Sequence, residues 1–133
     1  YDHLLYPHHK RIADFFKAKR LPVIQHIDGD VRQYIPLIIK AGFSAIQPLE
    51  ARAHNDVQEL KEKWGEKIAF IGNISAEGLS GSRKDVEAEV RSKVLKAKEG
   101  GGYVFHSDHS VPPTVSWKNY SYAIKLAKKV GQY

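Results

Sequence analysis

Residues 23–30 read VIQHIDGD, an apolar and β-branched start followed by ionisable side chains where a strand should end. Three further stretches have the same order of residue types: residues 45–50 (AIQPLE), 68–73 (IAFIGN) and 103–109 (YVFHSDH). Each is followed by a segment of helical composition, so we expect four consecutive βα units. Parallel α/β proteins carry their chemistry at the C-terminal edge of the sheet, and we expect the ionisable residues to gather there.

The helical segments have apolar residues on one face and recognisable end signals. We expect one helix at residues 6–19, before the first strand, and a second that ends at about Ala41. Three more are expected: at 57–64, from a capping box at Ser82 and Asp85 to the glycines at 100–102, and at 117–130. Alternating strands and helices predict an α/β fold with a parallel sheet. Four strands are too few to close a (β/α)8 barrel, which takes about 250 residues. The chain is therefore expected to be either half of a TIM barrel or a small open α/β sheet.

Composition narrows the function classes. A chain of 133 residues with 42% hydrophobic and 27% charged residues predicts one globular domain, and its apolar runs are too short to cross a membrane. The sequence contains no cysteine and begins without a secretion signal, so we expect a cytoplasmic location. The net charge of +6 is spread over helices among acidic residues, which argues against nucleic acid and favours a small anionic substrate.

The first two strands end in a possible site. His26 and Asp28 are two residues apart, so a regular strand would point both to the same side. Such a pair can bind a metal or orient an imidazole as a general base, and it can equally be a hydrogen-bonded structural pair. Glu50 ends the next strand; it is either an exposed loop carboxylate or a neighbour of His26 and Asp28.

The last two strands add further candidates. Strand alternation would send His106 and Asp108 to one side and His109 to the other, unless the strand has already ended. Asn73 could bind a substrate carboxylate, or it could cap the following turn. His106 also has a structural alternative, as a loop residue that supports other groups.

These segments together resemble the C-terminal half of the uroporphyrinogen decarboxylase family. The resemblance runs through nearly the whole chain and is carried by HIDGDV at 26–31, AGF at 41–43, QPLE at 47–50, GNI at 72–74 and GGY through DHSVPP at 101–113. It implies that residues 1–133 are one domain made of four βα units preceded by a helix, the C-terminal part of a longer (β/α)8 barrel. The chain lacks methionine, including at position 1, and we expect Tyr1 to follow processing or to begin a fragment.

The decarboxylases of this family act in porphyrin biosynthesis. They remove carboxylate from the acetate side chains of uroporphyrinogen III without a metal or an organic cofactor, and a histidine after the last strand contacts the substrate. His109 matches that position. Together with the strand-end positions, this makes His109 and Asp28 candidate catalytic residues and Asn73, His106 and Asp108 candidate substrate-binding residues. The family's essential acidic residue and substrate-binding arginines are expected in the N-terminal half.

A second branch of the family, the cobamide-dependent methyltransferases, implies another chemistry. Those enzymes bind zinc and use it to activate a thiol acceptor. Their ligand positions correspond here to His26, Asp28, Glu50 and His109, with Asp and His in place of two cysteines. All four residue types can bind zinc. A set of nitrogen and oxygen donors without thiolates would also suit manganese or iron, and the third alternative is that these residues bind no metal.

Three hypotheses follow for the chain: a lyase fragment, a metal-dependent methyltransferase-like enzyme, or a non-enzymatic half barrel that binds or assembles. Whether the chain is an enzyme by itself stays open at this stage. The half barrel would leave strands at both edges of its sheet unpaired, at about residues 22–27 and 102–107. We therefore expect it to form a homodimer or to be completed by an N-terminal half.

Overall fold

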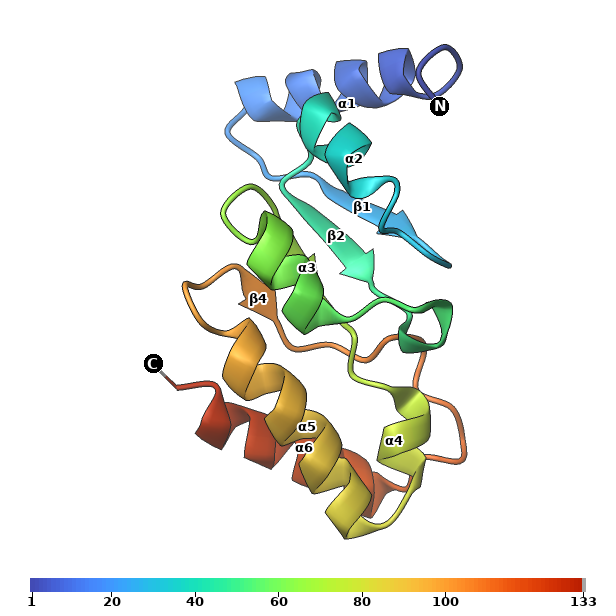
Figure 1. The fold of residues 1–133 in the computed structure, drawn as a ribbon, viewed down its shortest axis with the longest axis vertical. Coiled ribbons are helices and arrows are strands. Elements are labelled where there is room, and N and C mark those ends of the chain that lie inside the picture. The colour runs from blue at the N-terminus through green and yellow to red at the C-terminus, as the bar shows by residue number, and fades with distance from the viewer. Residues whose placement is uncertain (133) are drawn as a thin grey trace.

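The computed structural model describes residues 1–132 and shows a mixed α/β arrangement with a four-stranded parallel sheet (Figure 1). The strands are β1 (Ile24–Ile27), β2 (Ala45–Pro48), β3 (Ala69–Ile71) and β4 (Tyr103–Val104). The helices are α1 (Tyr6–Ala18), α2 (Ile35–Ala41), α3 (Val57–Trp64), α4 (Ala76–Ser80), α5 (Arg83–Ala97) and α6 (Trp117–Val130), with a 3-10 helix η1 (Ala51–Ala53). Within the described part of the chain, no helix is both long and apolar enough to cross a lipid bilayer.

The strands pair in the order of the sequence, β1-β2-β3-β4, and every pair is parallel. His26 lies opposite Gln47, and Ile46 lies opposite Phe70. The predicted α/β fold with a parallel sheet is thus confirmed, and it is compatible with part of a (β/α)8 barrel. β1 and β4 form the two edges of the sheet, as expected.

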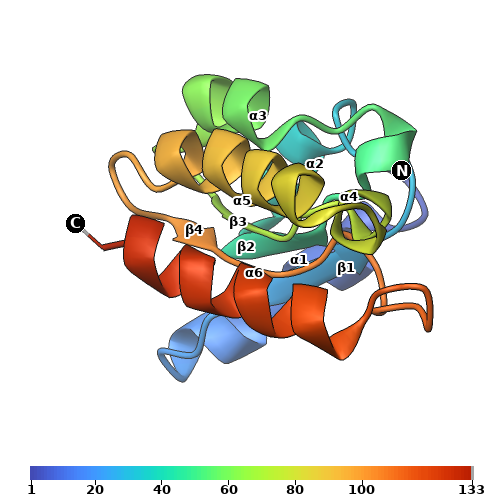
Figure 2. The same ribbon diagram turned by 90° about the horizontal axis from the view of Figure 1, so that it is seen from below.

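Helices α2, α3 and α5 cover one face of the sheet. Figure 2 shows α2, α3 and α5 on the same side of the strands, while Figure 1 shows α1 and α6 at opposite ends of the molecule. Ile46 and Phe70 point to the covered side and are fully buried among residues of these helices. Alternation sends Ile24, His26 and Val104 to the other face, where Ile24 is 48% and Val104 51% exposed.

Local signals explain the helix ends. Asp56 caps α3 by accepting a hydrogen bond from the Gln58 amide, and Ser82 and Asp85 form the predicted capping box of α5. The hydrogen bonds from Ser82 lower the pKa of the Asp85 carboxyl. Gly42 ends α2 in the left-handed conformation, at φ 98°, which glycine adopts without strain.

Three features of the strand ends differ from the sequence expectation or were absent from it. β4 stops at Val104 and its neighbour β3 at Ile71, and beyond them an isolated bridge joins Ile74 and Ser107. The short helices η1 and α4 were not predicted. Both are too short for a helical pattern of apolar residues to be recognised in the sequence.

The end of β3 approaches the end of β2 very closely. A Cβ atom on Gly72 would lie 1.8 Å from the carbonyl oxygen of Pro48, and the φ of Gly72 is +117°. Only glycine satisfies both conditions. This contact places Asn73 against the β2 loop, where the Asn73 amide donates to the Pro48 carbonyl at 2.9 Å.

Three buried polar side chains, Asn55, Asn73 and Asp108, connect the loops that follow the strands. The Asn55 side chain accepts from the Val31 amide at 3.1 Å and donates to the carbonyls of Gly29 and Glu50 at 2.9 Å each. It therefore joins the loop after β1 to the loop after β2. Buried backbone groups need such partners because an unpaired one costs about 1 to 3 kcal/mol.

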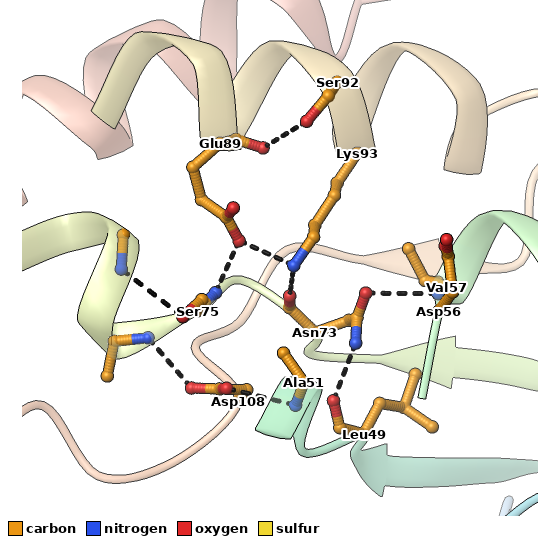
Figure 3. A network of polar contacts seen from close by, with 12 residues as sticks. Leu49, Ala51, Asp56, Val57, Asn73, Ser75, Glu89, Ser92, Lys93 and Asp108 are labelled. Carbon is orange, nitrogen blue, oxygen red and sulfur yellow. Dashed lines mark hydrogen bonds and ion pairs between the residues drawn. The ribbon is translucent and has the colours of Figure 1, made fainter. Parts of the chain in front are cut away.

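Asn73 joins the β3 loop to the β2 loop in the same way (Figure 3). Its side-chain oxygen accepts from the Val57 amide at 3.1 Å, and its nitrogen donates to the carbonyls of Leu49 at 2.8 Å and Asn55 at 2.7 Å. Its own φ is 68°, a left-handed value that asparagine tolerates better than most residues. The side chain therefore stabilises two loops at once.

Helix α5 is attached to this network by an ion pair. Lys93 lies 2.6 Å from the Glu89 carboxylate and donates to the Asn73 carbonyl, while Glu89 accepts from the Ser75 amide at 2.6 Å (Figure 3). Both side chains are largely buried, at 16% and 17% exposure. The loop between β3 and α4 is thus held from the helix layer as well.

Replacing Asn73 by alanine should lower the free energy of unfolding by at least about 3 kcal/mol, because buried amide and carbonyl groups lose their partners. Urea denaturation of the purified chain measures this. Gln33→Ala, which removes an amide from an exposed position, is the control and should change the value by less than about 0.5 kcal/mol. A loss below about 1 kcal/mol for Asn73→Ala would show that the network is not essential to the fold.

Candidate functional site

A hollow of about 520 Å³ lies at the C-terminal ends of the strands. It is bounded by the ends of β1 and β2, the loop after β4, α4 and α6. The residues that line it are His26, Asp28, Gln47, Pro48, Leu79, Phe105, His106, Ser107, His109, Ser110, Val111, Tyr120 and Ile124. The expectation that ionisable residues after the strands meet at one edge therefore holds in this hollow for the first and fourth strands.

His26 and Asp28 both face this hollow. The Nε2 atom of His26 lies 3.6 Å from Oδ1 of Asp28, which is too long for a hydrogen bond and close enough for an ion pair when the imidazole is protonated. Their side chains are 61% and 66% exposed. The pair is therefore accessible to a ligand and is not a buried structural contact.

Asp30 has a different environment from Asp28. Two nitrogens of the Arg32 guanidinium donate to Asp30 at 2.9 and 2.6 Å, and these hydrogen bonds lower the pKa of the Asp30 carboxyl to about 2. Asp30 therefore stays ionised and paired at neutral pH. Of the two aspartates in this loop, Asp28 is the one that remains available.

The loop after β4 brings His106 and His109 to the same hollow. The sequence left this open, because strand alternation would have separated them. The strand has already ended at Val104, so alternation does not apply. Nδ1 of His106 lies 2.5 Å from the Ser107 carbonyl, whereas within residues 1–132 the ring of His109 makes no hydrogen bond.

A second hollow, of about 530 Å³, adjoins the first. His109 and Ser110 line both, and the second hollow adds mainly charged and polar residues: Glu50, Arg52, Ser75, Glu77, Ser80, Asp108 and Thr114. Arg52 and Glu77 form an exposed ion pair at 3.5 Å across it. The two hollows therefore meet at His109 and Ser110, and His109 is the ionisable one of the two.

Several predicted site residues are engaged in the fold. Asn73 is fully buried, and Asp108 is 4% exposed with both oxygens bonded to backbone amides. Glu50 directs one oxygen to the Gly29 amide at 3.0 Å and faces the second hollow, whereas His26 and Asp28 face the first. Substrate binding by Asn73 and Asp108 stays a prediction, and the contacts seen here are structural.

The model of the family described as "Uroporphyrinogen decarboxylase (URO-D)" matches residues 1–130, almost the whole chain. The chain belongs to the uroporphyrinogen decarboxylase family. The resemblance inferred from HIDGDV, QPLE, GNI and DHSVPP is thereby confirmed.

Two relatives carry the name uroporphyrinogen decarboxylase. The protein of Pseudoalteromonas translucida (strain TAC 125) is 25% identical over 107 residues, which are 70% of this chain and 30% of that protein. The protein of Picosynechococcus sp. (strain ATCC 27264 / PCC 7002 / PR-6) is 24% identical over 135 residues, which cover 100% of this chain and 37% of that protein. The uroporphyrinogen decarboxylase-family chain described here thus spans about a third of the length of these curated relatives.

The four residues aligned with the zinc ligands of the methyltransferase branch do not converge in this URO-D family chain. Among residues 1–132, no three His, Cys, Asp or Glu side chains are grouped as metal ligands. His26 and Asp28 form a pair, Glu50 is bonded to the Gly29 amide, and His109 lies at the boundary of the two hollows. A zinc site usually needs at least three protein ligands, so this arrangement does not fit one.

Some residues of the hollow were not singled out from the sequence. Gln47 faces it because it is the register partner of His26, and Tyr120 and Ile124 face it from α6. Tyr120 and Ile124 lie in the helix expected at residues 117–130, and apolar residues on one face of a helix predict burial and give no sign of a site. Gln47 could have been found from the two-residue alternation in AIQPLE, which places it on the face opposite Ile46.

We predict that zinc at saturating concentration will not raise the melting temperature of the purified chain, because two ligands bind zinc weakly and stabilisation follows affinity for the native state. Thermal denaturation with and without zinc measures this. His26→Ala is the matched variant. If zinc raises the melting temperature of the unsubstituted chain and not that of His26→Ala, the metal hypothesis is supported and the ligands must rearrange on binding.

Proposed function

We propose that this chain forms part of a uroporphyrinogen decarboxylase-like site, which binds a tetrapyrrole by its carboxylates and supports removal of acetate carboxylates. The observation that carries the proposal is the position of His109. It matches the substrate-contacting histidine implied by the family resemblance, and its ring is exposed at the junction of two hollows. The family match over residues 1–130 supports the assignment.

The hydrogen-bonding groups around the first hollow suit a ligand that carries carboxylates. His26, His106 and His109 surround it, and Asp28 is the acidic side chain among the residues that line it. An imidazole N–H donates to a carboxylate oxygen, and a protonated imidazole adds a charge-assisted bond. The apolar residues Phe105, Val111 and Ile124 complete a surface that suits an aromatic ring system with carboxylate substituents.

The residues have separate roles in this proposal. His109 donates a hydrogen bond to a substrate carboxylate, and His106 binds a second one from the same loop. His26 and Asp28, at the end of β1, contact the other side of the ligand. This assignment needs no metal and no organic cofactor, as expected for the decarboxylase branch.

The open face of the sheet supports the view that the functional unit is larger than this chain. Ile24 and Val104 are apolar and about half exposed on that face, and β1 and β4 are both edges. We propose that these surfaces correspond to the interior and the seams of a (β/α)8 barrel. The remaining strands would come from further protein sequence, and decarboxylation would need both parts. The cytoplasmic location stays a prediction.

Binding of uroporphyrin III, the oxidised and fluorescent form of the substrate, tests the proposal directly. We expect the chain to bind it and His109→Ala to weaken binding by about tenfold or more, the effect of losing a hydrogen bond to a charged group. Fluorescence titration measures both affinities. We expect no decarboxylation of uroporphyrinogen III by the chain alone.

Two controls make this titration specific. His8→Ala removes an exposed histidine on α1, outside both hollows, and should leave the affinity unchanged. The uncharged methyl ester of uroporphyrin should bind much more weakly than the free acid, because it cannot form charge-assisted hydrogen bonds. Equal binding of acid and ester, or an unchanged affinity in His109→Ala, would refute the proposed role of His109.

A further inference from the structure

Asp108 is a buried carboxylate between three loops. Its Oδ2 atom accepts from the Ala51 amide at 3.1 Å, and its Oδ1 atom accepts from the Ala76 amide at 2.9 Å (Figure 3). Ala51 begins η1 after β2, and Ala76 begins α4 after β3. One side chain from the β4 loop therefore bonds the first residue of each of the two preceding connections.

The residues next to these contacts face the site. Ala51 directly follows Glu50, and Asp108 directly precedes His109, so the hydrogen bond from Ala51 to Asp108 joins the backbones that carry Glu50 and His109. Both of these side chains line the second hollow. A change of the Asp108 contact would therefore move both of them.

The backbone before His109 has further restraints. The Asp108 amide donates to the Ile74 carbonyl at 2.8 Å, and the Ser107 hydroxyl donates to the His109 carbonyl at 2.6 Å. The imidazole ring of His109 is exposed in the hollow. A restrained backbone with a free ring is the arrangement expected of a side chain that must be held ready for a ligand.

A carboxylate suits this position better than an amide of the same size. The carboxylate of Asp108 presents two acceptor oxygens to two N–H donors, and these hydrogen bonds compensate its burial. Asparagine would turn an NH₂ group toward one of these donors, and that donor would lose its partner. The chemistry of the two amides therefore specifies aspartate.

We propose that Asp108 is the positioning residue of this site, and that it sets the place of His109 relative to Glu50 without touching the ligand. The proposal uses the proposed function only in taking His109 as a substrate contact. It predicts that loss of one Asp108 hydrogen bond displaces the His109 ring and weakens binding of the ligand.

Asp108→Asn tests this with two measurements. The ring signal of His109 in a ¹H–¹³C NMR spectrum, assigned with His109→Gln, should shift or broaden, and the affinity for uroporphyrin III should fall by about fivefold, which corresponds to one hydrogen bond. Asp85→Asn is the matched control. It makes the same Asp-to-Asn change at a carboxylate that accepts from Ser82 through one oxygen only, so the amide oxygen can keep that contact, and it lies outside both hollows.

A second variant reaches the same hydrogen bond from the other side. Ala51→Pro removes the N–H that bonds Asp108. Proline is tolerated there, because Ala51 is the first residue of η1 and Glu50 before it has an extended ψ of 114°. This variant keeps the test possible if Asp108→Asn does not fold, and it should displace the His109 signal in the same way.

The outcomes separate the two proposals. If the His109 signal in Asp108→Asn and Ala51→Pro stays at its original position, as in Asp85→Asn, Asp108 is structural only and the positioning role is wrong. If the signal moves while no form of the chain binds uroporphyrin III, the positioning role holds and the proposed function fails.

Discussion

The loops that follow parallel strands bury backbone N–H and C=O groups for which the sheet offers no partner, and this constraint governs the C-terminal edge of the molecule. The chain meets it with Asn55, Asn73 and Asp108. Each comes from a loop later in the sequence and bonds backbone groups of an earlier one. An unpaired buried amide costs a sizeable share of the free energy of unfolding of a small domain. These side chains therefore hold the edge together.

This network divides the polar residues of the edge into two groups. The buried group bonds backbone, while His26, Asp28, His106 and His109 remain exposed to solvent in the first hollow. Members of the two groups can be adjacent in the sequence, since buried Asp108 directly precedes exposed His109. The rigid part of the edge therefore ends where the accessible part begins, and this lets exposed side chains keep a defined place without being buried.

Much of the fold could be predicted because its signals are local. The capping box at Ser82 and Asp85, the end of a helix at about Ala41 and the four apolar strand segments depend on signals within a few residues, and the structure confirms them. The division between buried and exposed polar residues could not be predicted. Asn73 and His109 both follow strands, and only contacts with other loops, distant in sequence, decide that one is buried and the other free. For the same reason, four possible zinc ligands in the sequence did not form a group in space.

Buried side chains fix the strand-end loops as firmly as hydrogen bonds between strands fix the sheet. Native-state hydrogen exchange of the amides of Ala51, Val57 and Ala76 tests it most directly, since these amides bond only to Asp108 and Asn73 side chains in the described structure. We predict that they exchange as slowly as the amide of Phe70, which bonds the Gly102 carbonyl within the sheet. Exchange as fast as that of the exposed Ser110 amide, while Phe70 stays protected, would contradict the account.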